Sequence, residues 1–97
     1  MRQFKTQKEM YKWIWENRSH VSEISGKPLL NQNHIQFIWQ FAHILPKGSY
    51  PKWKLNPDNI MLMLPYEHEN QEQYLLFIEK QNELKREYYK EFYSKEF

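Results

Sequence analysis

The stretch from residue 35 to residue 68 decides the fold, and it reads IQFIWQFAHILPKGSYPKWKLNPDNIMLMLPYEH. Large apolar residues occupy every second position over residues 35–42, and this period of two predicts a half-buried β-strand. Three prolines and a glycine within residues 46–58 predict a long ordered loop. The apolar run 60–64 then predicts a second strand that pairs with the first, and Pro65 suits the first position of a helix.

Helices are expected on both sides of this stretch. Before it, residues 6–9 (Thr-Gln-Lys-Glu) fit a capping box, and apolar residues at helical spacing predict a helix over residues 7–17. After it, a helix is expected to start near Pro65 and to run through at least Leu84. Residues 73–97 are then a C-terminal helical extension. These elements predict an α+β fold.

Length and composition limit the class of protein. The 97 residues are enough for one domain, residues 1–97. The chain has no Cys, which excludes a disulfide scaffold, a thiolate zinc site and a Cys nucleophile. No apolar run approaches the ~18 residues of a membrane span, and residues 1–15 lack the apolar core of a secretory signal. A cytoplasmic protein with no membrane partner is expected.

Charge is distributed unevenly along the chain. The net charge is +2, but residues 1–60 hold nine Lys/Arg and four Asp/Glu, whereas residues 61–97 hold five and eight. Three lysines of the predicted loop, Lys47, Lys52 and Lys54, have no acidic neighbour over residues 44–54; they are called the loop lysines below. This asymmetry fits a polyanionic partner such as nucleic acid, and it fits a solvated loop equally well.

Two of the four histidines occupy positions that the predicted topology brings together. His43 ends the first strand, and His68 falls in the first turn of the helix after the second strand. A strand–loop–strand–helix order places both imidazoles at one end of the hairpin. Imidazole titrates near neutral pH, which suits a general base. His34 lies in a polar segment and is expected to be exposed.

Three segments of the chain resemble the HNH endonuclease family in its small phage and bacterial form: FAHILPKG at 41–48, LNPDNI at 55–60 and PYEH at 65–68. The three motif residues are then His43, Asn59 and His68. The resemblance covers residues 19–72 as an HNH core. It implies a ββα-metal fold and the cytoplasm of a bacterial or phage-infected cell.

By this resemblance, the chain is a metal-dependent endonuclease that hydrolyses phosphodiester bonds of DNA, with RNA also open. His43 is the general base that activates water, Asn59 orients His43 or holds its loop, and His68 binds one divalent metal ion. Mg²⁺ or Mn²⁺ is expected first, and imidazole ligands would also accept Ni²⁺ or Zn²⁺. The loop faces the nucleic-acid backbone in the family, so the loop lysines would contact phosphates, with Tyr50 or Trp53 stacking on a base or sugar.

The chain departs from the family at the metal site. Ala42 stands where many members carry Asp as a metal ligand. Glu72 lies four residues after His68, on the same face if the helix continues, and is the candidate replacement. The alternative for Glu72 is an ordinary solvated helix residue. Asp58 and His20 are further candidates beside the site, and capping or packing is the alternative for His20.

The four positions of the zinc-binding cysteines in zinc-bearing members also differ. They correspond here to Ser22, Ser25, Leu64 and Glu67. No structural zinc is therefore expected, and packing is expected in its place.

Two other functions stay open. One is a nucleic-acid-binding module on the same fold without catalysis, in which Asn59 is a turn residue and Trp53 covers the core. The other is an adaptor that uses the C-terminal helix as a homodimer interface or as a surface within a larger complex. The aromatic residues of that surface would be Tyr88, Tyr89, Phe92 and Tyr93.

Overall fold

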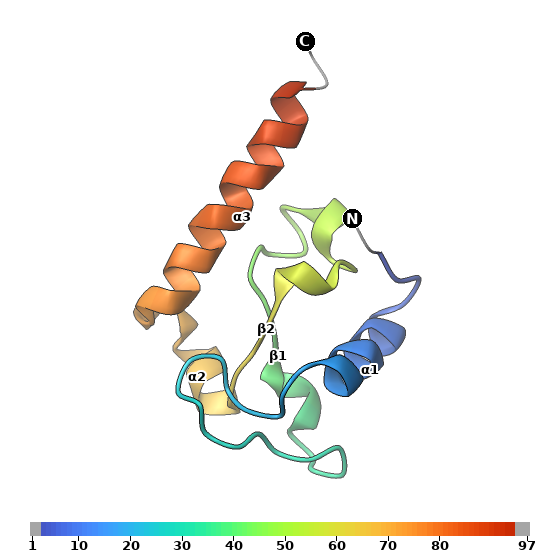
Figure 1. Cartoon of the computed structure of the whole chain (residues 1–97), viewed down its shortest axis with the longest axis vertical. Coiled ribbons are helices and arrows are strands. Elements are labelled where there is room, and N and C mark those ends of the chain that lie inside the picture. Colours follow the sequence, from blue (N-terminus) through green and yellow to red (C-terminus); the bar gives the residue numbers. More distant parts are fainter. Residues whose placement is uncertain (1–2, 95–97) are drawn as a thin grey trace.

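The computed structural model of the chain describes residues 3–94, with side chains described through residue 90 (Figure 1). Its helices and strands are, in chain order, α1 (Gln7–Asn17), β1 (Phe41–His43), β2 (Ile60–Leu62), α2 (Pro65–Glu69) and α3 (Leu75–Ser94). Short 3₁₀ turns lie at Phe37–Gln40, Pro51–Trp53, Pro57–Asn59 and Gln71–Gln73. Three helices and a two-stranded antiparallel sheet form a small α+β domain. Residues 1–2 and 95–97 of the expected single domain lie outside the described residues.

The N-terminal helix matches its prediction. α1 spans Gln7–Asn17, and the Glu9 backbone N–H donates to the Thr6 hydroxyl oxygen over 3.2 Å, as a capping residue requires. Met10, Ile14 and Trp15 form its buried face. The helix predicted over residues 7–17 is therefore confirmed.

The first strand is shorter than predicted. Only Phe41–His43 is strand, and Phe37–Gln40 forms a 3₁₀ turn. The predicted strand is therefore confirmed at Phe41 and Ala42 and is wrong over residues 35–40. The buried Gln40 amide explains the turn, because its Nε2 donates to the carbonyls of Leu30 and Phe37. The partner strand is also short, since a helix begins at Pro65 soon after β2 ends.

The second strand forms where it was expected. β2 covers Ile60–Leu62 and pairs with β1 in antiparallel register, with Phe41 opposite Leu62, Ala42 opposite Met61 and His43 opposite Ile60. Side chains of a strand alternate between the two faces of a sheet. His43 therefore shares its face with Phe41, while Ala42 points to the other.

The predicted helix from Pro65 through Leu84 is interrupted, which corrects that expectation. α2 ends at Glu69, a 3₁₀ turn follows, and α3 starts at Leu75. The Asn70 side chain donates to the Tyr66 carbonyl over 2.7 Å. It thereby competes with the backbone N–H groups that would continue the helix, which is how Asn side chains commonly end helices. The chain can therefore change direction between the two helices (Figure 1).

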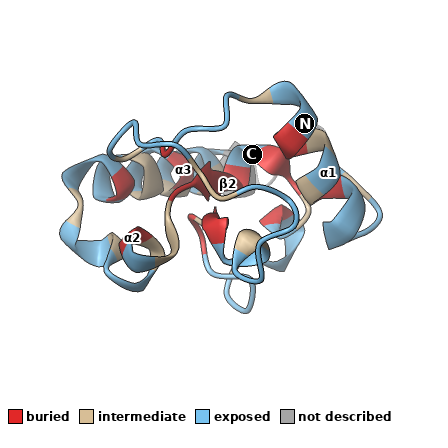
Figure 2. Ribbon diagram, turned by 90° about the horizontal axis from the view of Figure 1, so that it is seen from below, coloured by how far each residue is buried: buried red, intermediate tan, exposed pale blue. Residues whose placement is uncertain are grey.

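Two apolar clusters cover the opposite faces of the sheet. The α1 cluster contains Met10, Ile14, Trp15, Phe41, Ile60 and Leu62. The α3 cluster contains Ala42, Ile44, Leu45, Trp53, Met61, Met63, Phe77 and Leu84. Figure 2 shows the buried residues gathered along the strands and on the helix faces turned toward them. The two strands are thus the shared wall of both clusters.

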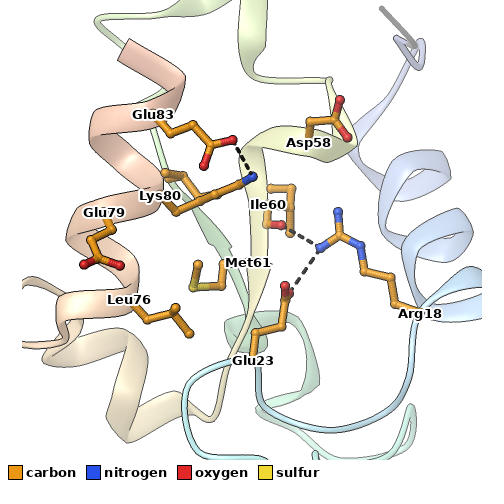
Figure 3. Close-up of a pocket in the computed structure, with 10 residues that line it drawn as sticks. Arg18, Glu23, Asp58, Ile60, Met61, Leu76, Glu79, Lys80 and Glu83 are labelled. Atoms are coloured by element: carbon orange, nitrogen blue, oxygen red, sulfur yellow. Dashed lines mark hydrogen bonds and ion pairs between the residues drawn. The ribbon is translucent and has the colours of Figure 1, made fainter. Parts of the chain in front are cut away.

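The free edge of β2 is closed by the segment that follows α1. The Glu23 backbone N–H donates to the Leu62 carbonyl, and Leu62 N–H donates to Glu23 Oε2 over 2.6 Å. The Arg18 guanidinium donates to the Ile60 carbonyl over 2.6 Å. Figure 3 shows Arg18 and Glu23 together at this edge, where they line a cavity of about 380 Å³ between β2 and α3. These bonds occupy the edge that could otherwise pair with another strand.

In the described part of the chain, none of the helices combines the length and the apolar character that crossing a membrane requires.

Candidate active site around His43

His43 ends β1, and its half-buried ring is held by the loop that follows. Its Nε2 lies 3.2 Å from the carbonyl oxygen of Lys54. A carbonyl only accepts hydrogen bonds, so Nε2 carries the proton of the neutral ring. Nδ1 then keeps its lone pair, which is the atom that can take a proton from water.

The environment keeps the His43 ring neutral. Burial is the main cause that lowers the pKa of His43 below its ordinary value, and the positive charges of Lys47 and His68 lower it further. The hydrogen bond with the Lys54 carbonyl acts in the opposite direction. A neutral imidazole at pH 7 is the form that acts as a base.

Asn59 holds the chain directly after His43. It is fully buried, its Oδ1 accepts from the Leu45 N–H over 2.7 Å, and its Nδ2 donates to the Leu45 carbonyl over 3.1 Å. Its own carbonyl accepts from Ile44 N–H over 2.8 Å. Asn59 was expected either to orient His43 or to hold its loop, and these contacts are the ones that hold the loop.

His68 lies on α2, and its ring is fixed in a similar way. Its Nδ1 lies 2.8 Å from the Trp39 carbonyl and therefore carries the proton, so Nε2 keeps its lone pair. A carbonyl that fixes the tautomer in this way is a common partner of metal-binding histidines. His68 is near enough to His43 for its charge to lower the pKa of His43.

The other expected metal ligands do not join the two histidines in a site. Glu72 is exposed on the turn Gln71–Gln73, beyond the end of α2, so the expectation that it shares a helical face with His68 is wrong. Ala42 is fully buried in the α3 cluster, on the face opposite to His43. Among the described residues, no three or more His, Asp or Glu side chains are grouped so as to hold a metal ion.

Asp58 and His20 lie in other surroundings. Asp58 is exposed on the turn Pro57–Asn59 and lines the cavity beside α3 (Figure 3). The His20 ring stacks on Trp15 with 3.6 Å between ring centroids, and its Nε2 lies 2.7 Å from the Trp15 carbonyl. These contacts agree with the alternative in which His20 has a packing role.

The loop lysines are all exposed, on a loop that the core holds in place. Trp53 is buried in the α3 cluster, as in the alternative in which it covers the core. Its ring is therefore not available to stack on a ligand. Tyr50 is half-buried and packs edge-on against Tyr88, with 4.9 Å between ring centroids. Lys47 donates to Gln7 Oε1 of α1 over 3.2 Å.

The positions of the absent zinc ligands are joined by hydrogen bonds, a feature that the sequence reasoning missed. Both Ser22 and Glu67 are buried, and the Ser22 hydroxyl donates to Glu67 Oε1 over 2.6 Å. The same oxygen accepts from Leu64 N–H over 2.8 Å. Ser22 in turn accepts from the N–H of Ser25 over 3.2 Å. A hydrogen-bonded polar network therefore stands at these positions, where packing was expected in place of zinc.

Tyr11 is a second residue that the sequence reasoning missed. Its ring stacks on Phe41 at 4.2 Å and lies 6.5 Å from the His43 ring, between centroids. Burial raises the pKa of Tyr11 to about 12, so its hydroxyl stays protonated. The signal was present in the helical spacing of Gln7, Tyr11 and Trp15, four residues apart, beside the core-facing stripe.

For the adaptor alternative, the structure describes two of the four aromatic side chains. Tyr88 packs against the α3 cluster, and Tyr89 is exposed. The side chains of Phe92 and Tyr93 lie outside those described.

Comparison with protein-family models, with curated proteins and with solved structures found no match to this chain.

Proposed function

We propose that the chain is an endonuclease of the HNH type, which hydrolyses phosphodiester bonds of DNA with His43 as general base. β1, the loop, β2 and α2 would be its ββα unit. The observation that carries the proposal is the geometry of His43. Its Nε2 is engaged by the Lys54 carbonyl and its loop is held by the buried Asn59 amide, so Nδ1 is the atom left to accept a proton.

The chemical step follows from the residues of the chain. His43 Nδ1 takes a proton from a water molecule, whose oxygen attacks phosphorus, and the bond from phosphorus to the leaving sugar oxygen breaks. Positive charge near the phosphate stabilises the negative charge that develops. The exposed loop lysines would supply it. The resemblance also implies Mg²⁺ or Mn²⁺, which His68 would hold through Nε2 and which would supply further positive charge at the phosphate.

The test is nicking of supercoiled plasmid by the full chain, in parallel reactions with Mg²⁺, Mn²⁺, Ni²⁺, Zn²⁺ or EDTA. We expect His43→Ala to lower the nicking rate about 100-fold or more, as loss of a general base does. His34→Ala is the matched control, because His34 is exposed in a separate segment and should leave the rate unchanged. Circular dichroism checks that both variants are folded. Equal rates in both variants would refute the role of His43.

A second candidate function is DNA binding without cleavage. The observation that favours it is the burial of Ala42 together with the lack of a three-donor group among the described side chains. This candidate predicts salt-dependent DNA binding by a folded chain that nicks plasmid in none of the five reactions.

A further inference from the structure

A groove on the α1 side of the molecule adjoins His43. It has a volume of about 380 Å³, within the roughly 300–1,000 Å³ typical of ligand sites. Its apolar lining comes from α1 and from the turn before β1: Tyr11, Trp15, Phe37 and Ile38. The side chains of Lys8 and Lys12 also line it, and none of its described lining residues is acidic.

The aromatic lining is held in place by its own packing. Trp15 meets Phe37 edge-on with 4.8 Å between ring centroids, and Phe37 meets Phe41 edge-on at 5.3 Å. Tyr11 stacks on Phe41. Side chains that are already ordered lose little entropy when a ligand binds. The groove is therefore preformed for a flat, apolar group.

The apolar surface continues beyond the groove. Ile38 is 62% exposed, and its neighbours Ile35 and Trp39 are 90% and 57% exposed. Large apolar residues exposed close together in the chain can mark an interaction site. We therefore expect this surface to bind a partner that has apolar faces.

Charge selects the class of that partner. Lys8 and Lys12 are exposed cations beside an aromatic lining. Lys12 also lies 4.0 Å from Glu16, but both side chains are largely exposed, and such surface pairs are weak. Aromatic side chains with neighbouring cations are how proteins bind unpaired bases and the phosphates that join them.

The groove is continuous with the proposed active site through two contacts. Tyr11 lines the groove and lies 6.5 Å from the His43 ring, between centroids. Gln7 also lines the groove and accepts a hydrogen bond from Lys47 of the loop. A strand with its phosphate at His43 would have its neighbouring nucleotide at the groove.

We infer that the groove binds an unpaired nucleobase of single-stranded DNA next to the phosphate that His43 acts on. The inference rests on the proposed function, and it assigns a substrate class to it: DNA with at least one unpaired base beside the cleavage point. Base contacts come from the half-buried rings of Tyr11 and Phe37 and from the exposed Ile38, and Lys8 and Lys12 bind the adjoining phosphates.

Binding of a labelled eight-nucleotide oligothymidylate tests the inference, compared with an abasic strand of the same length and charge. Fluorescence anisotropy is measured with the full chain carrying His43→Ala, so that no cleavage interferes. We expect the strand with bases to bind about fivefold tighter or more, since stacking of one base supplies at least that factor. A ratio near one would overturn the inference.

Two matched variants locate the base contact. Ile38→Asp adds a charge and removes an apolar wall of the groove, and it should bring the ratio close to one. Leu75→Asp makes the same change at a residue that is 68% exposed at the start of α3, and it should keep the ratio. The added negative charge weakens binding of the strand with bases and of the abasic strand to the same extent. The ratio of the two affinities therefore reports the contribution of the base alone. A ratio unchanged in Ile38→Asp, or lost equally in both variants, would overturn the inference.

A third variant addresses the phosphates. The double substitution Lys8→Ala and Lys12→Ala should weaken binding of the two strands equally. It should also lower the slope of log K against log salt by about 1.4, since each phosphate contact on a single strand contributes about 0.7. Plasmid nicking by the chain with His43 intact separates the two proposals. Cleavage of the oligothymidylate is measured in parallel, because the inferred substrate has an unpaired base. Cleavage of either DNA with a ratio near one would refute the groove and leave the nuclease, whereas a high ratio without cleavage of either DNA would support base binding in the groove and refute the nuclease.

Discussion

At the scale of single residues, two hydrogen-bonded side chains define the candidate site. The Lys54 carbonyl determines which nitrogen of His43 carries the proton. The buried Asn59 amide binds both backbone groups of Leu45, so the residues after His43 have little freedom to move. The His43 ring and its loop are therefore ordered, as the general-base role proposed for His43 requires.

The lowered pKa of His43 gives a prediction on pH. The folded chain holds His43 neutral to a lower pH than the unfolded chain does. Between the two pKa values, the unfolded state therefore binds more protons than the folded state. Because of this difference, His43 lowers the stability of the fold as the pH falls below about 6.5. NMR titration of the His43 imidazole should give a midpoint below 6.5. Lys47→Met should raise it, because a positive charge that lowers the pKa is removed.

Lys27→Met is the control for that titration. Lys27 is exposed and contacts the Tyr66 hydroxyl, away from the loop, so its loss should leave the midpoint of His43 unchanged. A midpoint at 6.5 or above, or equal midpoints in the two variants, would contradict the assigned environment.

At the scale of elements, polar side chains from residues 18–23 hold the strands and α2 together. Arg18 closes the edge of β2 with a bond to Ile60 (Figure 3), and Glu23 closes it with a bond to Leu62. Ser22 joins the same segment to Glu67 of α2. These bonds position α2, and with it His68, relative to β1.

Removal of the Glu67 carboxyl should destabilise the domain. Glu67→Ala leaves the hydroxyl of Ser22 and the N–H of Leu64 without their acceptor, and each unsatisfied buried donor costs about 1–3 kcal/mol. We expect a loss of about 3 kcal/mol in the free energy of unfolding, measured by urea denaturation. Glu67→Gln keeps an acceptor oxygen and should cost only about 1 kcal/mol.

Glu69→Ala is the matched control on the same helix. Glu69 is exposed, so its substitution should change the free energy of unfolding by less than about 0.5 kcal/mol. Similar losses in Glu67→Ala and Glu69→Ala would show that the Ser22–Glu67 bond contributes nothing particular to stability.

At the scale of the whole molecule, charge separates the proposed binding side from α3. The first sixty residues have an excess of Lys and Arg, and the remainder has an excess of Glu. The loop lysines and the groove lysines Lys8 and Lys12 belong to the first part. A polyanion should therefore bind to the lysines of the loop and of α1 rather than to those of α3.

Substitution of the three loop lysines by Gln tests this arrangement. Affinity for duplex DNA should become less dependent on salt, with the slope of log K against log salt lower by about 2.7, because each phosphate contact contributes about 0.9. The same change at Lys80, Lys85 and Lys90 of α3 is the matched control, and it should leave the slope almost unchanged. Equal effects of the two triple variants would contradict a specific role of the loop.

The local features of the fold were predictable from the sequence. The helix over residues 7–17 depends on a cap and on spacings of three and four residues. The placement of His43 and Asn59 at the two ends of one loop followed from prolines and a glycine between two apolar runs. Such features depend on neighbouring residues, so a single sequence carries them.

Contacts between distant residues were not predictable in this way. A spacing of two over residues 35–42 indicated a strand, but the Gln40 amide and the three-residue partner β2 limited it to Phe41–His43. The end of α2 at Glu69 is a local feature that the sequence reasoning overlooked, because the Asn70 side chain donates to the Tyr66 carbonyl four residues earlier. Glu72 consequently lost the helical relation to His68 on which its expected role depended.

The sequence by itself thus determined the fold class, the first helix, the position of the second strand and the loop that joins His43 to Asn59. Only the tertiary structure decided the length of the first strand, the Ser22–Glu67 network and the groove beside Tyr11. The physical reason is that hydrogen bonds and ring contacts between residues far apart in the chain leave no periodic pattern in the sequence. They arise when the apolar clusters on both faces of the sheet bring those residues together.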